Sequence, residues 1–241
     1  MIKPIVILRK AHKWLGLFVG IQVFFWVFGG LIMTLWPIEE IRGSHLYKLP
    51  EKKQVSAEQI ESLSKLLIDN NMQASQISIE SGYTGSIAKV QTADNNTIWF
   101  DLNNQAALQP IEETDARDIA DSIYTGKGKV SLITKIMEHS SEYKRQLPAW
   151  KVNFDDEEST VFYLDAQTGE LSSVRTDRWR LFDFVWMLHI MDYEERENFH
   201  HPLIITAASL ALLMVFSGIY LIFKTFSRRD VKWLVGAKAK K

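Results

Sequence analysis

Four of the six histidines lie where the chain is expected to meet the edges of a membrane: His12, His200 and His201 flank two long apolar runs, and His189 lies in a shorter apolar stretch. Imidazoles that project from facing membrane helices can ligate the iron of a b-type haem, which also needs an apolar slot. His189 with His200 or His201 would supply such a pair at one edge, and a haem b there would make the protein an oxidoreductase. The alternative is positional, because a histidine at a membrane edge can bond headgroups or backbone.

His12 stands at the far end of the first run, about 30 Å from the other three if both runs form straight helices across a bilayer. The second run has no histidine near that end, so a haem site that uses His12 would need a second copy of the chain. Gly16 and Gly20 follow His12 in a G-x-x-x-G spacing, which permits close helix approach. A homodimer through these two glycines is therefore one expected partner arrangement.

Other chemistry finds little support. The chain has no cysteine, which excludes disulfides, thiolate metal sites, iron–sulfur clusters and covalent haem attachment. It has no H-E-x-x-H motif and no glycine-rich phosphate loop between a strand and a helix. The acidic run 155–158 is typical of a solvated hairpin loop, with a loose divalent-cation site as the alternative. We assign no catalytic residue and no metal site.

The two apolar runs are long enough to cross a membrane. Residues 14–36 and 203–223 contain no charged side chain. A helix rises about 1.5 Å per residue, so about 20 residues cross a hydrocarbon core of about 30 Å. A cleaved signal peptide is the alternative for the first run, but its apolar core would be shorter. We expect spans at 14–36 and 202–223, the second opened by Pro202, with the lipid bilayer as a partner.

The charges predict the orientation. The tails 1–13 and 224–241 hold eleven basic residues and one acid, a net charge of +10. The whole chain carries −1, so the part between the tails carries −11. Basic segments beside membrane helices stay in the cytoplasm. We therefore expect a two-pass protein of the bacterial inner membrane, with both termini cytoplasmic and the domain 37–180 periplasmic. An acidic outer domain argues against nucleic acid as a partner.

The domain between the spans is predicted to be α+β and to contain an internal repeat. Ser56 and Gln59 form a capping box that opens a helix, and Thr114 or Asp115 caps a second one that ends near Tyr124. Two units of a helix followed by an antiparallel sheet, about 55–110 and 113–175, account for this pattern. The expected strands are 76–80, 86–92 and 97–102, then 143–147, 149–154 and 160–165, with a further helix at 130–139.

Residues 181–201 are expected to form a membrane-proximal element. The stretch 181–191 is apolar, aromatic and too short to cross a bilayer. Tryptophan and tyrosine favour the membrane–water interface, so we expect an interfacial helix that leads into a linker. The alternative is a buried helix of the outer domain.

Sequence motifs suggest a family. The string 162–171, with Asp165, Thr168 and Gly169, resembles the hairpin that ends a strand in PepSY domains, as does Trp150-Lys151-Val152. The first unit carries Asp101 at the corresponding place without the Thr-Gly pair. Residues 9–17 and 186–221 resemble the PepSY-associated membrane helices.

The absence of a catalytic constellation favours a membrane-anchored module that binds or regulates an envelope protein partner. Surface changes in the strands near Trp99 or Trp150 should then impair it. Some larger relatives are ferri-siderophore reductases that look like membrane dihaem proteins. The resemblance therefore leaves an alternative function, a haem-binding redox component of iron uptake or transmembrane electron transfer.

Overall fold

The computed structural model describes residues 4–51, 55–82, 85–94, 96–198 and 200–225. The chain divides into two compact units. One consists of residues 1–35 with 182–241, and the other of residues 36–181. The expected basic tails lie in part outside the described residues, namely at 1–3 and 226–241.

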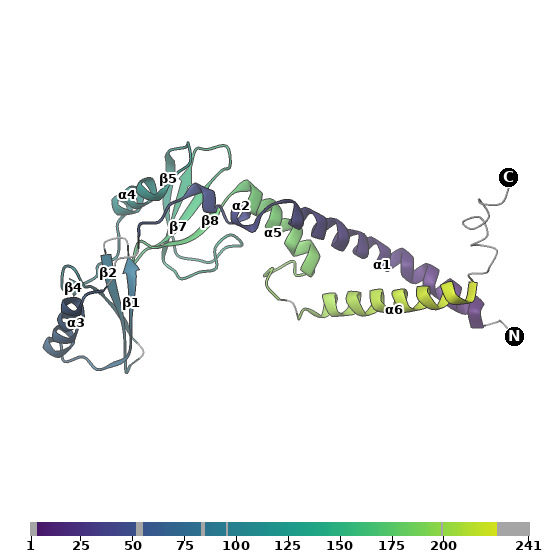
Figure 1. Cartoon of the computed structure of the whole chain (residues 1–241), viewed down its shortest axis with the longest axis horizontal. Coiled ribbons are helices and arrows are strands. Elements are labelled where there is room, and N and C mark those ends of the chain that lie inside the picture. The colour runs from purple at the N-terminus through teal and green to yellow at the C-terminus, as the bar shows by residue number, and fades with distance from the viewer. Residues whose placement is uncertain (1–3, 52–54, 83–84, 95, 199, 226–241) are drawn as a thin grey trace, which may run out of the picture. The chain divides into compact units, whose positions relative to one another are not determined.

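The first unit contains two helices that are long and apolar enough to cross a membrane, α1 (Pro4–Leu35) and α6 (Pro202–Thr225). They lie side by side and antiparallel (Figure 1). The Arg9 guanidinium donates to Thr225 Oγ1 at 3.4 Å, which brings the start of α1 to the end of α6. No residue of α6 is fully buried: one side of the helix is half-buried, and most of its large apolar side chains are exposed. Both spans expected from the sequence are thus helices.

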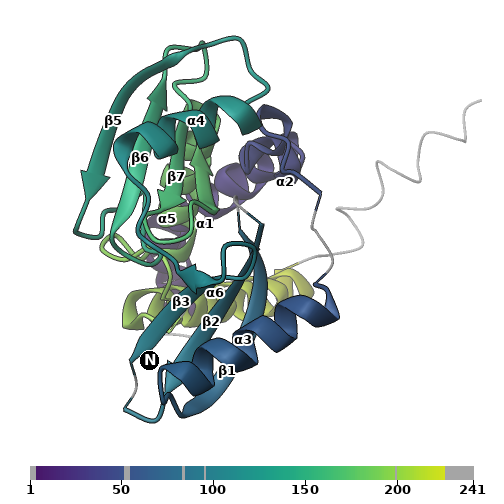
Figure 2. The ribbon, with the colours of Figure 1, turned by 90° about the vertical axis from the view of Figure 1, so that its left-hand side faces the viewer.

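The second unit opens with two short helices, α2 (Ile38–Ile41) and η1 (Ser44–Leu46). A helix and an antiparallel sheet of order β1-β2-β3-β4 follow. Their bounds are α3 (Ala57–Asp69), β1 (Ala74–Gly82), β2 (Gly85–Thr92), β3 (Thr97–Asp101) and β4 (Ala106–Ala107). The predicted capping box is confirmed: Ser56 Oγ accepts from the Gln59 backbone N–H, and Gln59 Oε1 accepts from the Ser56 N–H. α3 covers one face of this sheet (Figure 2), where Leu63 packs on Val90 and Phe100.

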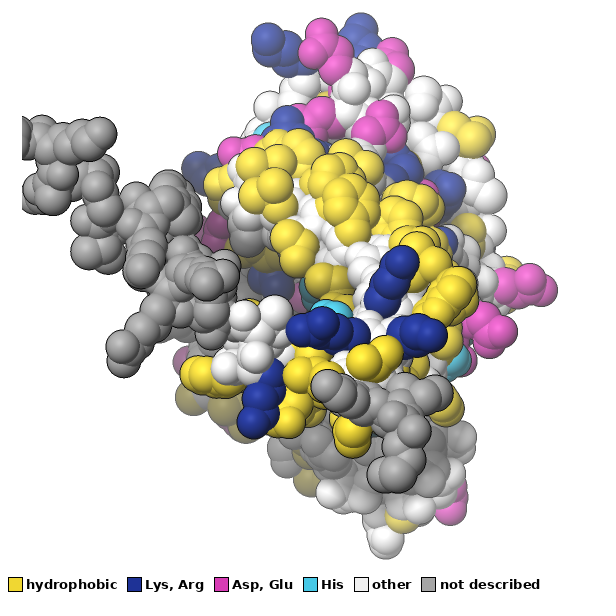
Figure 3. Space-filling model, turned by 90° about the vertical axis from the view of Figure 1, so that its right-hand side faces the viewer, with side chains coloured by type: hydrophobic (Ala, Val, Ile, Leu, Met, Phe, Trp, Pro, Cys, Tyr) yellow, Lys and Arg dark blue, Asp and Glu magenta, His cyan; other side chains and the backbone are white. Residues whose placement is uncertain are grey.

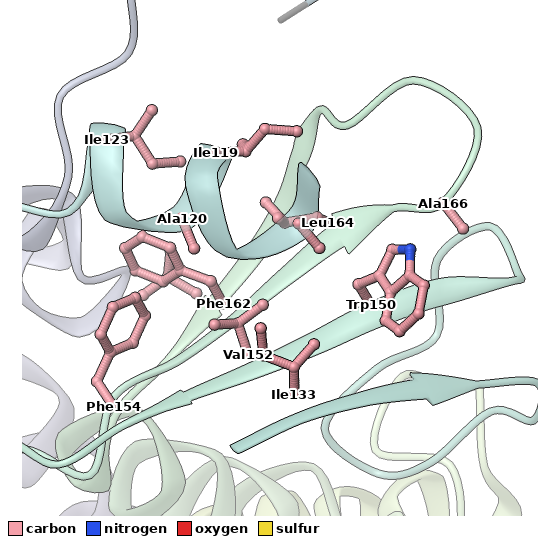
Figure 4. Close-up of a cluster of buried hydrophobic side chains, with 12 residues drawn as sticks. Ile119, Ala120, Ile123, Ile133, Trp150, Val152, Phe154, Phe162, Leu164 and Ala166 are labelled. Carbon is pink, nitrogen blue, oxygen red and sulfur yellow. The ribbon is translucent and has the colours of Figure 1, made fainter. Parts of the chain in front are cut away.

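A second helix and sheet repeat this arrangement, with strand order β5-β6-β7-β8. Their bounds are α4 (Glu113–Ile123), β5 (Val130–Ile136), β6 (Ala149–Phe154), β7 (Val161–Asp165) and β8 (Leu171–Arg175). The core lies between α4 and the sheet, where Ile119 and Ile123 meet Val152, Phe162 and Leu164 (Figure 4). The expected α+β class, with two antiparallel sheets that each follow a helix, is therefore confirmed.

Three local predictions are wrong. The segment predicted as a helix at 130–139 is strand β5, because its Val, Ile and Thr residues suit a pleated surface and its backbone pairs with β6. The predicted strand 143–147 is irregular, with one bridge from Ser140 to Tyr143. α4 begins earlier than predicted: its N-cap is Glu112, whose N–H donates to the Asp115 carboxylate at 2.9 Å.

The third strand of each sheet, β3 and β7, ends in the same turn, although only the turn after β7 has the Thr-Gly pair. Asp165 Oδ1 accepts from the backbone N–H groups of Gln167 and Thr168, each at 2.8 Å. Asp101 Oδ1 accepts from the corresponding N–H groups of the first unit at 2.8 and 3.2 Å. The residue four positions after each aspartate is left-handed, Gly169 with φ 72° and Gln105 with φ 52°. The aspartate thus defines the turn, and the glycine only makes it easier to adopt.

α5 (Asp177–Ile190) follows the second sheet, and the boundary between the two compact units falls within it. Thr176 caps it, since its Oγ1 accepts from the Trp179 N–H at 3.1 Å. The helix predicted at 181–191 is therefore present, and its placement at a membrane interface stays a prediction.

Candidate functional site at the membrane edges

His12 connects α1 to α6. Its Nδ1 lies 2.7 Å from Ser217 Oγ, and that hydroxyl donates to the Met214 carbonyl at 2.9 Å. A hydroxyl has one proton, so His12 Nδ1–H is the donor to Ser217. A Cβ on Gly218 would lie 3.2 Å from His12 Cε1, which shows that this glycine makes room for the imidazole ring. His12 therefore has a packing role within one chain.

His189 lies where α5 contacts α1. The indole N–H of Trp26 donates to the His189 backbone carbonyl at 2.8 Å. A Cβ on Gly29 would approach Val185 Cγ1 to 3.2 Å and His189 Nδ1 to 3.9 Å, so the glycine lets the helices approach. Among the described residues, His189 Nδ1 is buried without a hydrogen-bond partner. Gly29 lies about 25 Å along α1 from His12, which separates the two histidines.

The loop between α5 and α6 folds around Asp192, which the sequence analysis missed. This carboxylate is 3 % exposed. Its oxygens accept from the backbone N–H groups of four following residues, Glu194, Glu195, Glu197 and Asn198, at 2.9–3.3 Å. These bonds, that of Asn198 first, lower the pKa of Asp192 to about 2. The sequence signal for this turn is an aspartate at the start of a polar segment that follows a helix, because aspartate side chains bond the backbone N–H groups of nearby residues.

Arg196 anchors the same loop to α5. Its guanidinium forms an ion pair with Asp183, the one acid that interrupts the apolar stretch of that helix. Its carbonyl accepts from the Trp186 indole N–H at 3.1 Å. Both contacts hold the loop against the face of α5 that carries Trp186.

His201 caps α6, whereas His200 lies on the surface. The Nδ1 of His201 accepts from the Leu203 N–H at 3.3 Å, and its carbonyl accepts from the Ile204 N–H at 3.1 Å. The neutral imidazole then carries its proton on Nε2. His200 is exposed, and its backbone N–H donates to Asn198 Oδ1 at 2.8 Å.

His12 and His189 are thus not part of one site. His12 lies far along α1 from the contact of His189, and no hydrogen bond among the described residues joins two of the imidazoles. Haem ligation by His189, His200, His201 or His12 stays a prediction. In the part of the chain that the structure describes, no three His, Asp or Glu side chains group as a metal site would need.

The two expected dimer glycines differ in their surroundings. A Cβ on Gly16 would lie 3.7 Å from Met214 Sδ of the same chain, whereas one on Gly20 would meet nothing within 4 Å. α6 therefore already uses part of the G-x-x-x-G face, and the homodimer stays a prediction.

The α+β unit, residues 36–181, offers a second candidate site on the faces of its two sheets that lie opposite α3 and α4. In the second sheet, residues around Tyr143 cover this face, and the Tyr143 ring stacks on Tyr163 with centroids 4.7 Å apart. The corresponding residue of the first sheet is Trp99, half-buried, with Lys89 Nζ 5.1 Å from its ring centre. Trp150 is a core residue instead: it is 6 % exposed, and its N–H donates to the Ile111 carbonyl.

The family model described as the PepSY-associated TM region matches residues 9–241. No curated protein and no solved structure matches the chain.

Proposed function

This chain belongs to the PepSY-associated transmembrane family, and from that premise we propose that it is an envelope interaction module. Two membrane helices anchor it in the bacterial inner membrane, and its α+β unit binds a protein partner in the periplasm. The observation that carries the proposal is Trp99, which is only half-buried on the face of the first sheet that lies opposite α3.

The antiparallel pairing of α1 and α6 supports the topology. The contact of Arg9 with Thr225 puts the start of one helix beside the end of the other, so both chain ends leave the membrane on the same side. Lys and Arg side chains gather among the apolar ones at that end (Figure 3), where Arg9, Lys10, Lys13 and Lys224 lie. Basic residues favour the cytoplasmic side, which leaves the α+β unit in the periplasm.

The comparison of the two sheets indicates how a partner binds. Trp99 and Tyr163 occupy the same place in their sheets, opposite Lys89 and Lys151 on the neighbouring strands. The ring of Tyr163 is covered by Tyr143 of the same chain, whereas the ring of Trp99 is contacted by the ammonium group of Lys89. A partner that lays an aromatic or apolar side chain on Trp99 would complete the first sheet as Tyr143 completes the second. Stacked rings and large buried aromatics commonly dominate interface energies.

Site-specific photocrosslinking in intact cells tests this surface. A crosslinking amino acid at Gln91, on the same face and beside Lys89, is expected to give one discrete adduct, and W99A is expected to remove it. The matched control carries the crosslinker at Met137, which is 67 % exposed directly after β5 of the second sheet. An adduct at Gln91 that persists in W99A, or that forms equally from Met137, would contradict the proposed surface.

A second candidate function is a haem-binding redox component. The observation in its favour is His189 Nδ1, buried without a partner among the described residues beside Trp26 of α1. The fit is incomplete, because an axial imidazole usually donates its second N–H to an acceptor, and His201 Nδ1 already caps α6. Among the described residues, His189 thus offers a buried imidazole nitrogen without a partner, whereas His200 is exposed, and we derive no reaction through haem.

A reduced-minus-oxidised visible spectrum of the purified chain, expressed with ample haem, decides between the candidates. Stoichiometric α and Soret bands that disappear in H189A would favour the redox function. A spectrum without haem bands leaves the interaction module. The control is H45A, which changes a histidine of the α+β unit and should leave either spectrum unchanged.

A further inference from the structure

β1 is an edge strand of the first sheet, and one side of it is open. The strand order places β2 on one side of β1, and within the described part of the chain no strand pairs with the other side. Antiparallel pairing with β2 uses the backbone groups of alternate residues, so the remaining N–H and C=O groups of β1 point away from β2. A row of such groups is a template for a further strand.

β1 also lacks the features that protect other edges of the two sheets. It has nine residues, with no proline and no lysine, and its one charged residue is Glu80. Its register with β2 is irregular only at its start, between Ala74 and Gln76. β4, the opposite edge of the same sheet, has two residues, while β5 and β8 are shorter than β1 and contain Lys135 and Arg175. Short strands and basic residues limit edge pairing, so β1 is the edge most open to a partner.

The sequence of β1 is nearly symmetric about its central residue, Ser78. It reads ASQISIESG, so an isoleucine stands on each side of Ser78, followed by an amide at Gln76 and a carboxylate of the same length at Glu80. Two identical strands can pair antiparallel about a two-fold axis through their centre, which sets each residue opposite its symmetric counterpart. Ile77 would then lie opposite Ile79 of the other copy, and Gln76 opposite Glu80.

This register makes favourable pairs. Each Gln76 amide can donate to the Glu80 carboxylate of the other copy, whereas the two Glu80 carboxylates stay four positions apart along the strands. Apolar and hydrogen-bonded pairs across neighbouring strands stabilise a sheet, and like charges directly opposite each other destabilise it. Ile77 lies opposite Val90 of β2, on the face that α3 covers, yet it is 45 % exposed. A second copy of β1 would cover it.

α3 presents a further exposed isoleucine on the same side. Gln59 Nε2 donates to Asn103 Oδ1 at 2.9 Å, and Asn103 follows β3, so this side of α3 faces β3. Ile68 comes nine residues later, which is two and a half helical turns, and therefore lies on the opposite side of α3, toward β1. It is 74 % exposed. Two exposed isoleucines next to an open strand edge are typical of a surface that another protein covers.

We propose that β1 binds a second copy of this chain, paired antiparallel about Ser78, so that two four-stranded sheets become one continuous sheet. The two-fold axis stands perpendicular to the sheet and keeps both copies of α3 on one face. The outer edges of the joined sheet are then the short β4 strands, so the assembly closes at two copies. This contact differs from the predicted one through Gly16 and Gly20. It also leaves the opposite face, with Trp99, free for another partner.

Cysteine crosslinking of the full chain in membranes tests the register, because the chain has no cysteine of its own. S78C places two thiols directly opposite each other, where Cβ atoms about 4.5–5.5 Å apart come close to the spacing of a disulfide. Q76C alone or E80C alone lies about 13 Å from its own counterpart, whereas Q76C/E80C sets two thiols opposite each other. S131C, an exposed serine on the edge strand β5, is the matched control.

Mild oxidation should give an adduct of twice the chain mass in S78C and in Q76C/E80C, but not in Q76C, E80C or S131C. I77K, with an unchanged circular dichroism spectrum, should lower the S78C yield by roughly tenfold, because an edge lysine opposes pairing. L132K, at a residue 55 % exposed on β5, should leave that yield unchanged.

Three results would overturn the proposal. S78C could crosslink no better than S131C, which would mean that β1 does not meet a second copy. Q76C alone could crosslink as well as S78C, which would rule out pairing centred on Ser78. The S78C adduct could contain a different protein, identified by its mass, which would assign this edge to a strand of another partner.

Discussion

The indole N–H of Trp26 donates to the backbone carbonyl of His189 at 2.8 Å, and this bond joins the middle of α1 to the last turn of α5. A carbonyl in the last turn of a helix has no partner within the helix, so a side-chain donor from a neighbour satisfies it. Trp26 therefore stabilises both the end of α5 and its contact with α1.

Replacing Trp26 by Phe should weaken this contact, because the ring stays apolar while the donor is lost. We expect a loss of about 0.5–1.5 kcal/mol in the free energy of unfolding. Titration with a denaturing detergent, followed by circular dichroism, measures it. The matched control is W14F, at a position 61 % exposed on the same helix, which should change little. Equal losses in both variants would mean that the hydrogen bond to His189 contributes nothing.

The aspartate turn that follows β3 and β7 gives a second prediction: substitutions at the left-handed residue of the two turns should change the free energy of unfolding in opposite directions. G169A should destabilise the α+β unit by roughly 1–2 kcal/mol, since an L side chain at positive φ meets the following carbonyl. Q105G should stabilise it by up to roughly 1 kcal/mol, because Gln105 already bears that strain. Thermal unfolding of the full chain in detergent compares the two. A loss of stability in Q105G would show that its side-chain contacts outweigh the strain.

Much of the fold could be predicted because strong local patterns determine it. Two uncharged runs of more than 20 residues leave few arrangements other than membrane helices. The strands ending at Asp101 and Asp165 carry their own turn signals. The prediction of a helix over the segment 130–136 was wrong because its apolar residues fit both the helical and the strand period. Only pairing with β6 makes this segment a strand.

The sites were harder to predict because they depend on contacts between distant residues. Trp99 and Trp150 have the same residue type in strands of similar pattern, but only the structure shows that Trp150 is buried. The histidines were correctly noticed as polar residues at the ends of apolar runs, whereas the contacts of His12 and His201 depend on how the helices pack and begin.

The loop around Asp192 gives a prediction in acid. The pKa of this carboxylate is about 2 in the folded chain, against an ordinary value of 3.8, because backbone N–H groups bond its charged form. A lowered pKa means that the stabilisation is fully present above about pH 4 and is lost as the pH falls toward 2. Pepsin cleavage within residues 193–198 should therefore increase over that range.

D192N should make this loop open to cleavage even at pH 4, because an amide cannot accept all four N–H groups. The control is D118N, an exposed carboxylate on α4, which should cleave as the unchanged chain does. Cleavage of the unchanged chain that is constant from pH 4 to 2, relative to an unfolded substrate, would contradict the role of the Asp192 charge.

The contact of Gly218 with His12 gives the last prediction. G218V should destabilise the pair of membrane helices by roughly 1–3 kcal/mol, because its side chain overpacks a site where a Cβ already lies 3.2 Å from the imidazole. G20V is the matched control, since a Cβ there meets nothing within 4 Å. H12A in the G218V background should restore part of the loss, because it removes the ring that the valine meets. Detergent-induced unfolding of the four variants completes the cycle. Additive effects of H12A and G218V would show that the two positions do not touch, and a change of oligomeric state in G20V alone would instead assign that glycine to a contact between chains.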